Sequence, residues 1–312
     1  MKQQRSLMGY FIVMLKGMMM GAADAVPGVS GGTIAFITGI YEELIFSIRQ
    51  CNPKTLGLLF TKGPVYFWQA VNGNFLVSLL MGIAVSILTL AHVVLFMLDS
   101  YPEILWAFFF GLILASTWSI ARHIPTWNTR NSVLFIGGTL LAYIVTSISP
   151  TEIEATPLAI FLSGSLAICA MILPGISGSF ILLLLGMYSI ILQAVKGLEL
   201  NTILLFGAGA VIGLLSFSHV LHWLFSRYRI PTLSLMAGFL LGSLNKVWPW
   251  KYTTAYTLDR HGEQIPLVQE NVSPLNYEIL TGQYAYLWIS VIMIAVGIAL
   301  VLFIDRDTTS TD

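Results

Sequence analysis

Charged residues are scarce in this chain: only 10% of its 312 residues are Asp, Glu, Lys or Arg, whereas 56% are hydrophobic. A soluble domain of this length carries about a quarter charged residues. The scarcity therefore argues against a soluble protein and indicates a polytopic membrane protein. Lys and Arg together number 15, as do Asp and Glu, so the net charge gives no sign of a nucleic-acid partner.

Cysteine is almost absent. Cys51 and Cys169 are the only two, and both lie in or beside apolar segments, so we interpret them as small hydrophobic residues rather than a disulfide or metal pair. The sequence also lacks the cluster of nucleophile, acids, bases or metal ligands that a membrane lipid phosphatase needs. We therefore expect no enzyme, no metal and no cofactor. No small-residue cleavage site follows the first apolar run, so a cleaved signal peptide is not expected.

What the chain does contain is apolar segments, arranged in two halves, 1–150 and 151–312. The first half has, in order, a broken apolar hairpin, a mixed aromatic stretch suited to the membrane interface, and long helices: 7–48, 49–74 and 75–148. The second half has a broken hairpin, helices, a polar outward loop and a last helix: 157–195, 201–247, 251–282 and 285–304. Within these segments we predict continuous helices, among them 30–48, 75–98, 103–121, 132–148, 178–195, 201–225 and 231–247.

The two halves can be aligned by hand in two blocks. The first block matches Pro, Gly and Ser residues, and the second matches Asn, Gly and His residues, with an extra interfacial stretch between the blocks in the first half. Each half then has a broken or re-entrant hairpin followed by three transmembrane helices. An odd number of crossings turns the second half over, so the predicted fold is an all-α membrane protein of two inverted repeats.

The most distinctive matched stretches are 27–32 (PGVSGG) and 174–179 (PGISGS). Pro and Gly interrupt helices, and Ser30 and Ser177 stand where they can cap the helices that follow. Helix starts offer unpaired N–H groups and partial positive charge, which suit an anion. Breaks at matched positions of two halves indicate a transporter's binding site, although each stretch could also be an ordinary turn at the membrane surface. The predicted anion-binding residues are Gly28, Ser30, Gly31, Gly32, Thr33, Gly175, Ser177, Gly178 and Ser179.

Acidic residues near the first break are further candidates, because an ionisable group inside a membrane is functional by default. Asp24 precedes the break and Glu42 follows it, and we expect either to serve a coupling cation or to support the anion site. The alternative is that Glu42 and Glu43 reach the interface or neutralise Lys16 or Arg49.

Two histidines, His92 and His219, match across the repeat, and each lies within a long apolar helix. A single histidine on an apolar face is commonly a satisfied core group. The matched pair could also contact the anion or carry a proton.

The distribution of Lys and Arg predicts the orientation. With each hairpin entering and leaving on one side, eleven basic residues fall inside and four outside, in agreement with the positive-inside rule. The termini and the 122–131 loop are then cytoplasmic, while 151–156 and 251–282 face outward.

Residues 23–33 (ADAVPGVSGGT), 39–45 (GIYEELI) and 173–180 (LPGISGSF) resemble the paired signatures of the bacterial polyprenyl-phosphate transporters of the PopT type. The resemblance covers nearly the whole chain. It implies a multi-pass protein of the bacterial cytoplasmic membrane that returns undecaprenyl phosphate from the outer to the inner leaflet, for reuse in wall and glycan synthesis. Ser189 departs from the family pattern, which often has Glu there, so a carboxylate like Glu42 is not duplicated.

Under this resemblance the anion is a phosphate in a bilayer, and its inward passage moves negative charge toward the negative side. That step costs about 2.3 kcal/mol per charge and 100 mV, so we expect cotransport of H⁺ or Na⁺. A transporter or channel for a small soluble anion would use the same helix starts and is the alternative.

Overall fold

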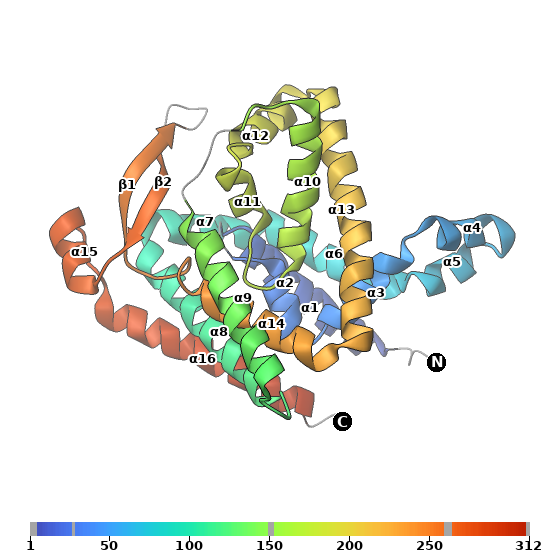
Figure 1. Cartoon of the computed structure of the whole chain (residues 1–312), viewed down its shortest axis with the longest axis horizontal. Coiled ribbons are helices and arrows are strands. Elements are labelled where there is room, and N and C mark those ends of the chain that lie inside the picture. The colour runs from blue at the N-terminus through green and yellow to red at the C-terminus, as the bar shows by residue number, and fades with distance from the viewer. Residues whose placement is uncertain (1–4, 27–28, 149–152, 259–263, 310–312) are drawn as a thin grey trace.

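The computed structural model describes residues 5–26, 29–148, 153–258 and 264–309, and these form helices with a single β-hairpin (Figure 1). The helices of the first half are α1 (Leu7–Asp24), α2 (Gly31–Ile37), α3 (Tyr41–Gln50), α4 (Pro53–Thr61), α5 (Pro64–Ala70), α6 (Gly73–Leu88), α7 (Leu90–Ser100), α8 (Pro102–Arg122) and α9 (Thr129–Ser147). The second half has α10 (Pro157–Ile172), α11 (Gly178–Leu184), α12 (Tyr188–Gly197), α13 (Leu200–Arg227), α14 (Arg229–Ser243), β1 (Lys251–Leu258), β2 (Gln264–Asn271), α15 (Pro274–Thr281) and α16 (Leu287–Thr309).

Several helices are long and apolar enough to cross a membrane. Among the described residues, α1, α8, α13 and the Leu287–Asp305 part of α16 pass this test, and up to 7 spans result if each bent helix pair counts as one. Many of their large apolar side chains are exposed, as expected for surfaces that face lipid. The chain is thus a polytopic membrane protein built almost entirely of helices, as its composition predicts.

The second arm of each hairpin is bent, contrary to the prediction of continuous helices over 30–48 and 178–195. Helices α2 and α3 meet at 119°, and α11 and α12 meet at 109°. Gly39 (φ 72°) and Gly186 (φ 67°) occupy the left-handed region at the two bends, a conformation that glycine adopts without steric cost. These matched glycines end α2 and α11 after two turns each.

Two other predicted segments also differ. The helix expected over 75–98 is divided into α6 and α7 at Thr89, whose backbone (φ −125°, ψ −73°) is not helical. The polar stretch 251–282, expected as a loop, forms the antiparallel pair β1–β2 and helix α15. A small core of Trp250, Tyr277 and Ala285 supports this unit, and the Trp250 indole donates to the Ala285 carbonyl at 2.8 Å.

The long helices associate in pairs at crossings where glycines face backbone oxygens. Helix α1 lies against α6, α10 against α13, α8 against α16 and α9 against α14. The distances from an ideal Cβ to the opposite backbone oxygen are 2.3 Å for Gly17 on Leu79, 2.0 Å for Gly82 on Met14, 2.3 Å for Gly164 on Phe206 and 1.9 Å for Gly209 on Phe161. No side chain fits at such distances, so glycine is required for these close helix contacts.

Polar contacts join element ends at two opposite sides of the molecule. On one, here called the arginine side, they connect Arg5 with Glu43, Glu42 with Arg229, Arg122 with Asp305, and Arg130 with the Tyr228 ring. On the other, here called the β-hairpin side, they connect Asn245 with Thr146, Ser147 and Asn271, and Tyr277 with Glu103. Helices α8, α9 and α14 run between the two sides (Figure 1).

Candidate functional site

The first loop, between α1 and α2, is organised by two side chains that accept from the start of α2. Ser30 is the N-cap residue, and its Oγ accepts from the Gly32 amide at 3.0 Å. The Asp24 carboxylate accepts from the Gly31 amide at 2.7 Å, so a carboxylate occupies the position that the helix start offers to an anion. Gly28 lies outside the described residues, and its predicted role is not placed.

The second loop, between α10 and α11, has the same plan with different contacts. Gly175 adopts φ 88° in this turn. Ser177 has extended N-cap geometry, but its hydroxyl pairs with the Ser179 hydroxyl at 2.9 Å instead of capping α11. Met171 stands at the position matched to Asp24, so the carboxylate is present in the first loop only.

The two loops interlock, because each one contacts the helix end beside the other. Ser30 Oγ donates to the Met171 carbonyl at 2.7 Å, and the Gly175 amide donates to Thr33 Oγ1 at 2.9 Å. An ideal Cβ on Gly32 would lie 2.5 Å from the Ile172 oxygen, so only glycine permits this approach. The loop hydroxyls are buried, with Ser30 1% and Thr33 0% exposed.

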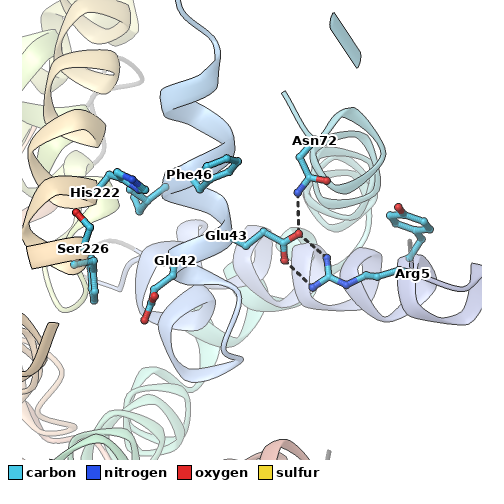
Figure 2. Close-up of a pocket in the computed structure, with 10 residues that line it drawn as sticks. Arg5, Glu42, Glu43, Phe46, Asn72, His222 and Ser226 are labelled. Atoms are coloured by element: carbon cyan, nitrogen blue, oxygen red, sulfur yellow. Dashed lines mark hydrogen bonds and ion pairs between the residues drawn. The ribbon is translucent and has the colours of Figure 1, made fainter. Parts of the chain in front are cut away.

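A separate pocket of about 550 Å³ lies on the arginine side, between α1, α3, α6 and α13 (Figure 2). Its polar centre is Glu43, which accepts two hydrogen bonds from Arg5 (2.9 and 2.6 Å) and one from Asn72 (2.8 Å). Glu42 accepts from Arg229 at 3.0 Å. Both carboxylates are thus ion-paired, but with Arg5 and Arg229 rather than with Lys16 or Arg49, the partners that the sequence alternative named. Lys16 donates instead to the Thr38 carbonyl at 2.6 Å.

The two matched histidines have exposed side chains on α7 and α13. The His219 ring bonds to the Leu215 carbonyl one turn earlier in its own helix, at 2.7 Å, and the roles predicted for His92 and His219 stay predictions. His222, one turn later, lines the pocket instead, with its ring centroid 5.9 Å from that of Phe46. The only sequence signal for His222 is its one-turn spacing from His219, which without a neighbouring carboxylate is a weak metal signal and does not predict the pocket.

The chemistry available at both places is binding rather than bond cleavage. In the described part of the chain, no group of three or more His, Cys, Asp and Glu side chains could hold a metal ion. The loops offer hydroxyls, backbone amides and one carboxylate. The pocket offers ion-paired carboxylates and a histidine, which are groups that bind cations or exchange protons.

Comparisons with known proteins agree with this picture. A family model described as undecaprenyl phosphate translocase-like matches residues 20–265. The chain is 48% identical over 299 residues to a protein of Vibrio cholerae named polyprenyl-phosphate transporter, covering 96% of this chain and 97% of that protein. It is 31% identical over 257 residues to a Staphylococcus aureus protein of the same name, covering 77% and 86%.

No solved structure matches this chain. The family match covers both interlocked loops, the bends that follow them, the pocket residues of α3 and α13, and Asn72 at the start of α6. A multi-pass helical protein that matches this family model, and that is 48% identical along almost its entire length to a polyprenyl-phosphate transporter, is a transporter and not an enzyme. The chain belongs to the undecaprenyl phosphate translocase-like family.

Proposed function

We propose that this protein moves a polyprenyl phosphate, of the undecaprenyl phosphate class, from the outer to the inner leaflet of the bacterial cytoplasmic membrane. The observation that carries the proposal is the contact between two buried, serine-bearing loops from the two halves of the chain. The names of the relatives supply the substrate class. The recovered lipid would then be reused in wall and glycan synthesis.

Such a lipid needs a protein because of its headgroup. A phosphate carries about −1.5 to −2 charges near neutral pH, and burying an unpaired charge in hydrocarbon is prohibitively costly. The loops would replace water with amides and with the hydroxyls of Ser30, Thr33, Ser177 and Ser179. Ser30, Thr33 and Ser177 are buried, and hydrogen bonds join each loop to the helix end beside the other. Passage of a headgroup therefore requires the loops to separate. The polyprenyl tail can remain in the lipid throughout.

An inverted repeat would place the two loops on opposite approaches to one site. The glycine crossings support it: Gly17 faces α6 as its matched residue Gly164 faces α13. Gly82 and Gly209 are likewise matched, and each faces the helix before its loop. The last helices of each half pack against those of the other half: α8 lies against α16, and α9 lies against α14.

We place the arginine side in the cytoplasm and the β-hairpin side outside. The arginine side gathers Arg5, Arg122, Arg130 and Arg229, and cytoplasmic surfaces of membrane proteins are enriched in Arg and Lys. The pocket of Figure 2 would then open toward the cytoplasm, on the side where the headgroup is delivered.

Cation coupling completes the proposal. Asp24 is the only carboxylate in contact with the described loop residues, where it holds the Gly31 amide. A phosphate arriving at this helix start would repel Asp24. Uptake of H⁺ or Na⁺ at Asp24 would relieve that repulsion and offset the electrical work of inward transport.

The test is reconstitution of the full-length protein in liposomes that carry a fluorescent polyprenyl monophosphate. Membrane-impermeant dithionite quenches the lipid that remains in the outer leaflet, so the inward rate can be measured. We expect protein-dependent transport of the monophosphate but not of the matching polyprenol phosphodiester. Liposomes with wild-type protein that behave like empty liposomes would refute the proposed function.

A further inference from the structure

Two lysines meet at the β-hairpin side, outside the interlocked loops. Lys246 follows α14, Lys251 begins β1, and Lys251 Nζ donates to the Lys246 carbonyl at 2.6 Å. Each ammonium group faces an aromatic ring. Lys246 Nζ lies 4.4 Å from the centre of the Phe180 ring, and Lys251 Nζ lies 3.6 Å from the centre of the Trp106 ring.

Neither lysine has a carboxylate partner among the described residues. The acid one turn before Trp106, Glu103, is already engaged by the Tyr277 hydroxyl. Burial lowers the pKa of both lysines, and the charge of Lys246 lowers the pKa of Lys251 further. Two lysine side chains are therefore held together in a partly dry place, with no acidic side chain paired to either of them in the part of the chain that the structure describes. A bound anion would favour the charged form of both.

The lysine pair adjoins the second loop. Phe180, whose ring contacts the Lys246 ammonium, lies in the first turn of α11, just after Ser177. The end of α14 touches the loop directly, because an ideal Cβ on Gly175 would lie 2.9 Å from the Phe239 oxygen. A group bound at Lys246 would thus lie beside the Phe180 ring, in the helix that begins directly after that loop.

We propose that Lys246 and Lys251 form an outer docking site for a phosphate monoester, which receives the headgroup before it enters the interlocked loops. This inference rests on the proposed function and adds a distinct first binding step to it. Lysine suits a transient site, since its ammonium is a mobile point charge without the fixed bidentate geometry of arginine. The ring contacts hold the ammonium groups until a phosphate, which binds a cation more strongly, replaces them.

The experiment is calorimetric titration of the purified full-length protein with farnesyl phosphate, farnesol and inorganic phosphate. The test variant is Lys246→Gln/Lys251→Gln, the charge-preserving variant is Lys246→Arg/Lys251→Arg, and the control is Lys54→Gln at an exposed position of α4. We expect the Gln variant to bind farnesyl phosphate about tenfold more weakly or worse. The Arg variant keeps both charges and should bind farnesyl phosphate at least as tightly as wild type. The Lys54→Gln variant should stay near wild type, and farnesol binding should be unchanged in all variants.

Wild-type affinity of the Gln variant for farnesyl phosphate would overturn the docking site. Equal, lysine-dependent binding of inorganic phosphate and farnesyl phosphate would support the site and identify free phosphate as its ligand. If the Gln variant fails to fold, the affinity of the wild-type protein for farnesyl phosphate still tests the proposal. This affinity should fall as the NaCl concentration increases, whereas the affinity for farnesol should not change. An affinity for farnesyl phosphate that is independent of salt would contradict the proposal.

Transport separates this inference from the proposed function. In liposomes, the Gln variant should need a higher concentration of outer-leaflet lipid for its half-maximal rate and keep its maximal rate. If the wild type transports and the Gln variant has the same KM, the docking site is refuted and the proposed function still stands. Absence of transport by the wild type would refute the function itself.

Discussion

Replacing Thr33 by Val removes one hydrogen bond between the two loops and little else. Thr33 is 0% exposed and its Oγ1 accepts from the Gly175 amide at 2.9 Å. Val has nearly the same shape but leaves that buried amide without a partner, which costs about 1–3 kcal/mol. If the Thr33 hydroxyl also contacts the headgroup, transport should fall together with stability.

Thr38→Val is a matched control in the same hairpin. Thr38 is 2% exposed, and its Oγ1 donates to the Ile34 carbonyl at 2.8 Å. That carbonyl also accepts from the Thr38 backbone amide at 2.9 Å, so the control leaves no backbone group unpaired and should cost less than about 1 kcal/mol.

The assay is thermal unfolding in detergent combined with the liposome transport rate. We expect Thr33→Val to unfold at a lower temperature than Thr38→Val and to transport more slowly, and Thr33→Ser to retain most transport because it keeps the hydroxyl. Equal stability and equal transport of the two Val variants would refute the reasoning that the contact between the loops matters.

Three further predictions follow from the same structure. Asp24→Asn should keep the fold and lipid binding but lose the response of transport to imposed H⁺ or Na⁺ gradients, and a wild-type response would exclude Asp24 as the coupling group. Gly209→Ala should lower stability by about 1–3 kcal/mol or more, because the new Cβ would lie 1.9 Å from the Phe161 oxygen, whereas Gly207→Ala in the same helix meets no atom within 4 Å and should be neutral. A single cysteine at residue 126 should resist an impermeant thiol reagent added to intact cells, while one at residue 253 should react, and the reverse pattern would invert the proposed orientation.

The membrane class and the hairpin breaks could be predicted from the sequence, because they depend on local chemistry. Few charges and long apolar runs define membrane helices, and Pro, Gly and Ser mark where a helix stops and starts again. The contact between the loops was predictable for a related reason, since a duplicated pattern implies a common site. The bends at Gly39 and Gly186 were within reach of the same logic, but a single glycine inside an apolar run is compatible with a continuing helix.

The remaining features depend on which distant residues meet. Arg5 and Glu43 are far apart in the sequence, and nothing local distinguishes Arg5 from Arg49 as the partner of that carboxylate. The lysine pair arises because a turn brings Lys246 and Lys251 against rings of α11 and α8. Such pairings follow from the tertiary fold, which residue patterns alone do not specify.

The most direct test of the central claim is transport by protein whose two loops are locked together. Cysteines replace Ser30 and Ser177 in a background where Cys51 and Cys169 are Ala, and a short, reducible bifunctional thiol reagent joins them. The loops must separate to admit a headgroup, so the account predicts that crosslinked protein does not transport polyprenyl phosphate and that reduction restores the rate. Fully crosslinked protein that transports at the uncrosslinked rate would contradict it.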